Sequence, residues 1–232
     1  MIRHDENLED KIFNMYEKLD IGNAEACLNC RNTTQNLSRP VSFWFVGDKY
    51  CFSKYKLLFI GKNARGNPGV ARNSYLDSRG RADELWEVSW PYWSYTRSIS
   101  DELYGSDSGD YIAYTNIMKC NNSDTVDTTS NSLKDNCISR MQIIKEEIKL
   151  LKPTNIVFLT SREYDEYFTS IFDEMTSIKS ENVAIGKKKM PWWEFRGTIE
   201  SSQINVLRIG HPERKNKVVY VSEVSNWVKN QK

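Results

Sequence analysis

Short apolar runs alternate with helix-like segments along this chain, and that alternation limits the possible folds more than any other feature. Runs rich in aromatic and β-branched residues predict buried strands at 41–46, 56–60, 111–114, 155–160 and 205–209. Helical spacing of apolar residues predicts helices over 6–20, 95–104, 137–151, 162–175 and 218–228. Strands that alternate with helices indicate an α/β fold, in which helices cover both faces of a parallel central sheet.

Length and charge narrow the class of protein further. With 232 residues the chain is long enough for a single domain, spanning 1–232, with a substantial core. A net charge of +1 excludes a strong overall basic field, so contacts with nucleic acid would have to come from local patches. No apolar run of about 18 residues and no signal-peptide pattern occurs, so we expect a cytoplasmic protein without a membrane segment.

Four of the five cysteines form a pattern that needs an explanation. Cys27 and Cys30 form a C-x2-C pair in a polar loop, and Cys120 and Cys137 follow far downstream. In a reducing compartment this pattern predicts a metal or cluster site rather than disulfides. Four thiolates suit zinc or a [4Fe–4S] cluster. The plainer alternative is four small buried hydrophobic residues, which is the role expected for Cys51.

Polar residues directly follow three of the predicted strands. Gly61 opens a glycine-rich turn, Asn116 follows the central strand, and His211 with Pro212 follows the last strand. The carboxyl ends of parallel strands share one edge of a sheet, so these residues predict a single cleft there. The alternatives are a turn-capping asparagine and a hydrogen-bonded core histidine. His4, the other histidine, is expected in a frayed terminus.

The order of these motifs resembles the uracil-DNA glycosylase superfamily, particularly its iron–sulfur branches. The segments that carry the resemblance are CLNC at 27–30, LLFIG at 57–61, PY at 91–92, TNIMKC at 115–120, Cys137, KPTNIVFL at 152–159, WWEFRG at 192–197 and HP at 211–212. The resemblance implies a three-layer αβα sandwich around a mainly parallel four-stranded sheet. It also implies a monofunctional enzyme that flips a base from DNA and hydrolyses its N-glycosidic bond, leaving an abasic site.

The resemblance implies a role for several of these residues. His211 would donate a hydrogen bond to the base oxygen, where negative charge grows as the glycosidic bond breaks. Asn116 would read the edge of the flipped base, and Tyr92 would stack on it; core packing is the alternative for Tyr92. The family's iron–sulfur branch usually has an acid in the glycine-rich turn. This chain has Lys62 at that position, and the resemblance implies that Lys62 contacts the substrate. Asn63 is then the candidate for positioning the attacking water, although it could be a plain turn residue.

The expected partner is DNA, bound by a monomer. Phosphate contacts are expected from Arg65, Arg72, Lys187–Lys189, Arg214 and Lys215. Trp192 and Trp193 lie in a basic, aromatic segment at 187–197 that we expect to be exposed and to contact unstacked bases. The segment 213–216 occupies the place of the family's DNA-inserting loop but has no apolar wedge.

The cofactor and the substrate each have two candidates. The resemblance favours a [4Fe–4S] cluster over zinc on Cys27, Cys30, Cys120 and Cys137. The polar segment at 67–93 favours a modified cytosine of foreign DNA, such as phage DNA, slightly over uracil, because polar groups in a pocket need partners. Lys62 in place of an acid also leaves room for a catalytically silent binder of modified or single-stranded DNA. A third alternative is a zinc-stapled nucleic-acid module unrelated to glycosylases.

Overall fold

A computed structural model describes residues 1–34, 37, 45–63, 76–120 and 129–231. Arg65 and Arg72 lie outside the described residues, as does most of the predicted strand at 41–46. Within the described parts of the chain, no helix has the length and apolar character that a membrane span requires.

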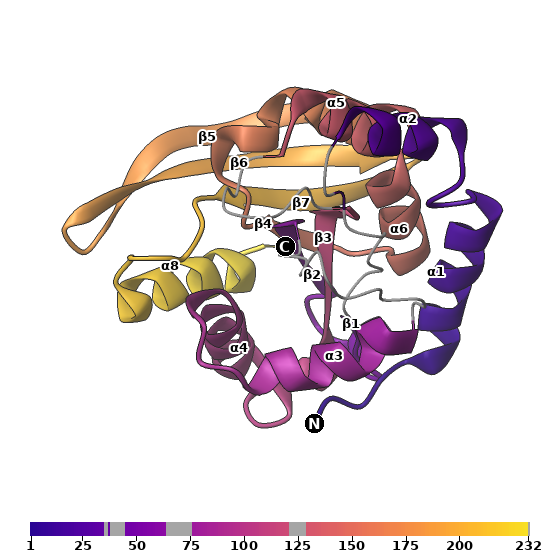
Figure 1. Ribbon diagram of the computed structural model, residues 1–232. Helices are drawn as coiled ribbons and strands as arrows, with labels where there is room; N and C mark the ends of the chain where they lie inside the picture. The colour runs from indigo at the N-terminus through magenta and orange to yellow at the C-terminus, as the bar shows by residue number, and fades with distance from the viewer. Residues whose placement is uncertain (35–36, 38–44, 64–75, 121–128, 232) are drawn as a thin grey trace.

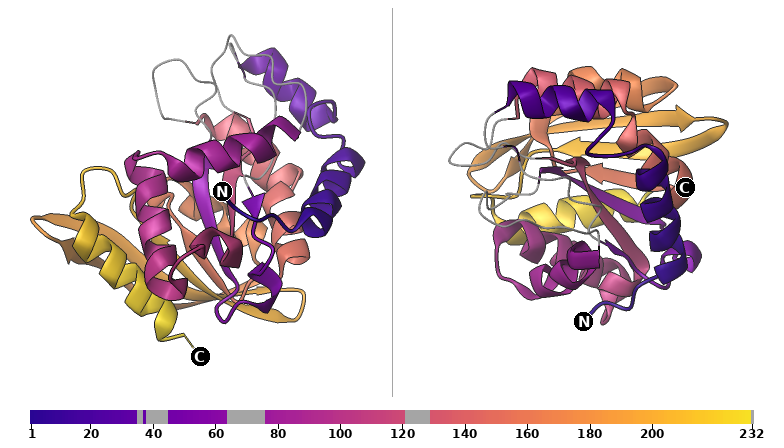
Figure 2. Two further views of the ribbon diagram at one scale, coloured as in Figure 1. Left: turned by 90° about the horizontal axis from the view of Figure 1, so that it is seen from below. Right: turned by 45° about the vertical axis from the view of Figure 1, so that its right-hand side comes forward.

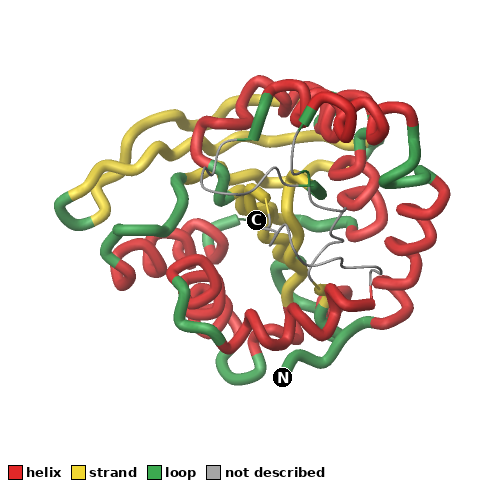
Figure 3. Tube along the Cα trace, in the orientation of Figure 1, coloured by secondary structure: helices red, strands yellow, loops and turns green. Residues whose placement is uncertain are grey.

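A mixed sheet of seven strands, in the order β1-β3-β2-β4-β7-β6-β5, forms the centre of the described structure (Figures 1 and 3). The strands are β1 Phe45–Val46, β2 Leu57–Asn63, β3 Ile112–Met118, β4 Asn155–Phe158, β5 Glu174–Ile185, β6 Lys188–Ile199 and β7 Ser202–Ile209. Strands β3, β2, β4 and β7 are parallel neighbours, while β1, β6 and β5 pair antiparallel. The α/β class is confirmed, but the expected sheet of four strands is wrong, because antiparallel strands extend the parallel centre on both sides.

Eight α-helices surround this sheet in the described chain. They are α1 Glu6–Lys18, α2 Glu25–Thr33, α3 Leu76–Glu87, α4 Pro91–Tyr104, α5 Asn131–Lys134, α6 Ile143–Leu151, α7 Phe168–Ile171 and α8 Lys217–Lys229. The first and last predicted helices are confirmed as α1 and α8. The helix predicted from residue 95 begins earlier, at Pro91, whose fixed φ suits the first helical position.

The sheet is buried on both faces by different helices (Figure 2). Along β2, Leu57 and Phe59 belong to the core shared with α3, α4 and α8, whereas Leu58 and Ile60 belong to the core shared with α1, α6 and α7. All four side chains are fully buried. The period of two sends successive residues to opposite faces, which explains the continuous apolar run in the sequence.

Three predicted segments differ from the structure. The polar loop expected at Cys27–Cys30 is the helix α2. The helix expected at 137–151 is divided: a π-helical turn, Asp135–Arg140, precedes α6, and Gln142 between them has a φ of 51°. The helix expected at 162–175 is a 3-10 segment, Ser161–Tyr167, followed by α7, because the chain beyond Phe172 joins the β5–β6 hairpin.

Candidate functional site

The carboxyl ends of β2 and β3 bring three predicted site residues together. Gly61 lies opposite Asn116 in the parallel register of these strands. A Cβ atom at Gly61 would overlap the hydroxyls of Tyr92 and Tyr114 and the Oδ1 of Asn116. The absence of a side chain at Gly61 therefore lets α4 approach the strand ends and place Tyr92 against Asn116.

His211 joins this group from the loop after β7. Its ring stacks on Tyr92, with the centroids 5.0 Å apart and 26° between the planes. The backbone N–H of Glu213 donates a hydrogen bond to Nδ1 of His211 at 3.2 Å. Because Nδ1 accepts, Nε2 carries the proton of the neutral ring. The half-buried imidazole can thus act as a hydrogen-bond donor without being charged.

Two tyrosines that the sequence did not single out hold the His211 loop. The hydroxyl of Tyr220 in α8 donates to the carbonyl of Gly210 at 2.9 Å. The hydroxyl of Tyr95 in α4 donates to the carbonyl of Lys215 at 2.7 Å. The loop is anchored on either side of His211, and one anchor belongs to the helix that carries Tyr92. No periodic pattern distinguishes these tyrosines from core residues, so only the tertiary structure identifies them.

Burial governs the protonation of the two phenols beside Gly61. It raises the pKa of Tyr92, a shift that contacts with Tyr114 and the Lys62 backbone partly oppose. Burial also raises the pKa of Tyr114, and the neighbouring Tyr92 raises it further. Both phenols stay neutral at physiological pH, so this end of the sheet carries hydroxyl groups rather than negative charge.

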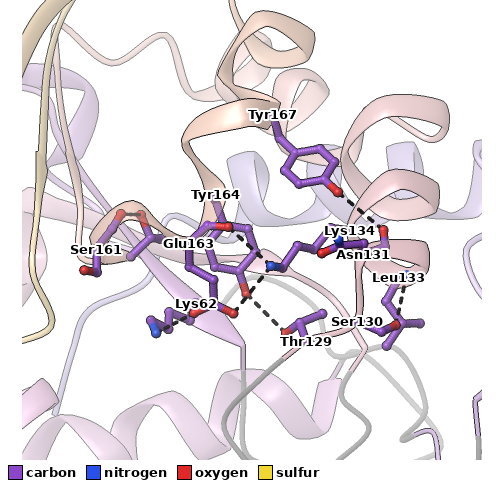
Figure 4. Close-up of polar contacts among 11 residues, drawn as sticks. Lys62, Thr129, Ser130, Asn131, Leu133, Lys134, Ser161, Glu163, Tyr164 and Tyr167 are labelled. Carbon is purple, nitrogen blue, oxygen red and sulfur yellow. Dashed lines mark hydrogen bonds and ion pairs between the residues drawn. The ribbon is translucent and has the colours of Figure 1, made fainter.

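Lys62, which the sequence places in the substrate pocket, forms an ion pair (Figure 4). Its Nζ donates to Oε2 of Glu163 at 2.6 Å, and Nζ of Lys134 lies 3.7 Å from Oε1 of the same carboxylate. Lys134 also lies over the ring of Tyr164, 5.0 Å from its centroid. Asn63 follows Lys62 as the last residue of β2 and is half-buried. An acidic side chain is thus supplied beside the turn by a segment distant in sequence.

All four predicted metal ligands line one pocket. Cys27 and Cys30 lie one turn apart on α2, Cys120 follows β3, and Cys137 belongs to the π-helical turn. Figure 1 shows α2 beside α5, which leads into that turn. Cys51, the fifth cysteine, is partly buried and is not among the residues that line this pocket.

Burial makes thiolates without a metal unfavourable in this pocket. Burial raises the pKa of Cys137 to about 12, and the Lys119 backbone and charge act in the opposite direction. Burial also raises the pKa of Cys120, as do the other three cysteines, which indicates that the thiols are close to one another. Asn136 donates from Nδ2 to the sulfur of Cys30 at 3.1 Å. A positively charged metal group would relieve this crowding of thiols, although no three His, Cys, Asp or Glu side chains of the described chain are placed to hold a single ion.

A buried ion-pair network joins the cysteine pocket to Asn116. Lys119 lies 2.5 Å from Oε1 of Glu147 and donates to Oγ1 of Thr115 at 2.8 Å and to the carbonyl of Asn116 at 2.7 Å. Glu147 also accepts hydrogen bonds from Tyr16 and Thr115. The network fixes the end of β3 that carries Asn116. In the sequence, the one indication of this network is the acidic Glu147, which lies within the apolar stripe of the predicted helix at 137–151.

The predicted DNA contacts divide into exposed cations and a buried tryptophan. Trp192 is only 4% exposed and donates to Glu194 at 2.5 Å, so the expectation of an exposed Trp192 is wrong. It lies in β6, where alternation turns its ring into the core beneath α4 and α8.

Arg214 and Lys187–Lys189 are exposed, and Lys215 is half-buried. Burial lowers the pKa of Lys215 and the charge of Lys188 lowers it further, while the charge of Glu213 acts in the opposite direction.

The N-terminus also differs from expectation. His4 is well ordered rather than frayed: its Nδ1 lies 2.7 Å from Oε1 of Glu9, and its backbone forms a bridge with Gly47.

The candidate site therefore comprises the group of Tyr92, Asn116 and His211 around Gly61, a pocket of four cysteines, and basic residues of the β5–β6 hairpin and the His211 loop. A scan against protein-family models and a search of curated proteins found no match to this chain.

Proposed function

We propose that this protein is a DNA glycosylase of the uracil-DNA glycosylase type, with a three-layer αβα sandwich. The single observation that carries the proposal is the convergence of Tyr92, Asn116 and His211 around Gly61. These residues come from three distant segments of the chain, which supports a shared role for them. Nδ1 of His211 accepts a hydrogen bond from the backbone of Glu213, so the proton of the neutral ring lies on Nε2, as the proposed role requires.

In the proposed reaction a flipped base enters the cleft and the bond between its nitrogen and C1′ of the sugar breaks. Asn116 offers both a donor and an acceptor to the edge of the base. Nε2–H of His211 donates to the base oxygen as that oxygen gains negative charge, which stabilises the leaving group. Asn63 positions the attacking water. Tyr92 provides the aromatic surface of the pocket.

The four cysteines are proposed to hold a [4Fe–4S] cluster, with zinc as the alternative. Cys27, Cys30, Cys120 and Cys137 would be its ligands. The cluster would supply a cross-link between α2, the end of β3 and the π-helical turn. Arg214, Lys215 and Lys187–Lys189 would bind phosphates, with the protein acting as a monomer.

The preferred substrate is proposed to be a modified cytosine of foreign DNA, with uracil close behind. The alternative function is a silent binder of modified or single-stranded DNA, which is favoured by Lys62 in place of an acid. One experiment separates these functions: DNAs with uracil, hydroxymethylcytosine or glucosylated hydroxymethylcytosine are incubated with the protein and then cleaved with alkali. Strand cleavage at the modified position supports a glycosylase, whereas tight binding without cleavage of any substrate supports the silent binder. Rapid and preferential release of uracil would contradict the proposed substrate.

A further inference from the structure

The ion pair between Lys62 and Glu163 points to a group that the resemblance does not include. We propose that Glu163 is the general base of the hydrolysis and takes a proton from the attacking water. This inference rests on the proposed function, because it assigns a role within that same reaction.

The sheet topology places Glu163 at the edge where the cleft lies. Strands β2 and β4 are parallel neighbours, with Ile60 opposite Phe158, so the segments that follow them emerge side by side. Glu163 belongs to the 3-10 segment after β4, and it reaches Lys62 near the end of β2.

Figure 4 shows Tyr164 close to Glu163, Lys134 and Thr129. Burial raises the pKa of Tyr164, and the nearby Glu163 and Tyr92 raise it further. The hydroxyl of Tyr164 also lies 3.2 Å from Oγ1 of Thr129. The hydrogen bond from Lys62 places the Glu163 carboxylate beside the end of β2 that carries Gly61.

The contacts of the carboxylate suit a base. Nζ of Lys62 lies 2.6 Å from Oε2 and Nζ of Lys134 lies 3.7 Å from Oε1, so the carboxylate is held between two cations. Only Oε2 is engaged by a short hydrogen bond, at 2.6 Å. Oε1 accepts no hydrogen bond from the described residues and is shielded from solvent. It keeps an acceptor site for one water molecule.

The proposed step balances in atoms and charge. The water oxygen forms a bond to C1′ while the bond from C1′ to the base nitrogen breaks, and the bonding electron pair leaves with the base. The water proton passes to Glu163. The departing anion, stabilised by His211, takes a proton from solvent, and Glu163 later returns its own proton to solvent.

The isosteric variant Glu163→Gln tests this role, with Glu166→Gln as the matched control on an exposed position of the same 3-10 segment. Single-turnover release of the preferred base should fall by ~10²–10⁴ in Glu163→Gln, with DNA affinity within about twofold of wild type. Glu166→Gln should retain the wild-type rate.

A second variant keeps the test decisive if the amide disturbs the fold. Glu163→Ala leaves space for a small carboxylate. Added formate should therefore raise the base-release rate of this variant at least tenfold, whereas chloride at equal ionic strength should leave the rate unchanged. If Glu163→Ala loses activity and formate does not restore it, Glu163 has a structural role and is not the base. A wild-type rate in Glu163→Gln would overturn the base role while leaving the glycosylase intact. Failure of the wild type to release any base would overturn both proposals.

Discussion

The imidazole of His211 stacks on the phenol of Tyr92 at a centroid distance of 5.0 Å, although 119 positions separate the two residues (211 − 92). The stacking fixes the plane of the imidazole, and the N–H of Glu213 fixes its tautomer. The proton of the neutral ring therefore lies on Nε2, the atom to which the proposed function gives the donor role.

Replacing His211 should therefore slow base release without weakening DNA binding. For His211→Ala we expect a single-turnover rate ~10²–10³ lower than wild type, the loss typical of removing one donor to a developing negative charge. Affinity for the same DNA, measured by fluorescence anisotropy, should stay within about twofold. Tyr220→Phe is the companion variant, because it removes the hydroxyl anchor to Gly210 but leaves the imidazole. It should lose far less rate, and an equal loss in both variants would mean that loop order, not the donor, matters.

The cysteine pocket predicts a metal content. Protein purified without oxygen should be brown and contain roughly four irons per chain, the complement of one [4Fe–4S] cluster. Cys120→Ser should lose this colour and iron, whereas Cys51→Ser should keep both, since Cys51 is not among the pocket-lining residues. Colourless protein with one zinc per chain would show that the same cysteines bind zinc instead of a cluster. Metal-free protein with unchanged stability would remove the site.

The pair of His4 and Glu9 predicts a pH dependence of stability. Burial lowers the pKa of His4, but the hydrogen bond and charge of Glu9, with the charge of Asp83, outweigh it and raise the pKa above the ordinary value of 6.5. A raised pKa means that the folded state binds the proton more tightly than the unfolded state. The contribution is fully present below about pH 6.5 and is lost as the pH rises through the folded-state pKa.

Urea denaturation at pH 5.5 and pH 8.5 measures this contribution. The free energy of unfolding of the wild type should decrease between these values relative to that of His4→Gln, which cannot bind the proton. Parallel changes in the two proteins would show that other groups dominate this pH range.

The buried pair of Lys119 and Glu147 predicts a large stability effect. Glu147→Gln should lower the free energy of unfolding by roughly 3–5 kcal/mol, because it leaves the ammonium of Lys119 buried without a counter-charge. Tyr16→Phe removes one hydrogen bond to the same carboxylate and should cost only about 1 kcal/mol. The double variant Glu147→Gln with Lys119→Met should recover part of the loss. Urea denaturation of the wild type and the three variants measures these free energies of unfolding. A Glu147→Gln variant as stable as the wild type would contradict this account.

Several parts of the fold followed from the sequence because they depend on local periodicity. The apolar run at Leu57–Ile60 can satisfy its backbone only within a sheet that is covered on both faces, and that is where β2 lies. The spacing of Leu8 and Ile12 likewise predicted α1. Placement of Gly61, Asn116 and His211 at strand ends predicted their convergence, since parallel strands share an edge.

Other features depend on contacts between distant segments, and no local pattern contains them. Trp192 carries the same signal whether it faces solvent or core, and the register of β6 against β7 decided that it is buried. The chain at 174 and 175 could have continued a helix, but pairing with β6 made it a strand, because tertiary packing outweighs helix propensities of a few tenths of a kcal/mol. The sequence by itself determined which residues gather at the sheet edge. Only the tertiary structure decided that Glu163 meets Lys62 there, because an ion pair between positions 62 and 163 depends on the order of the strands.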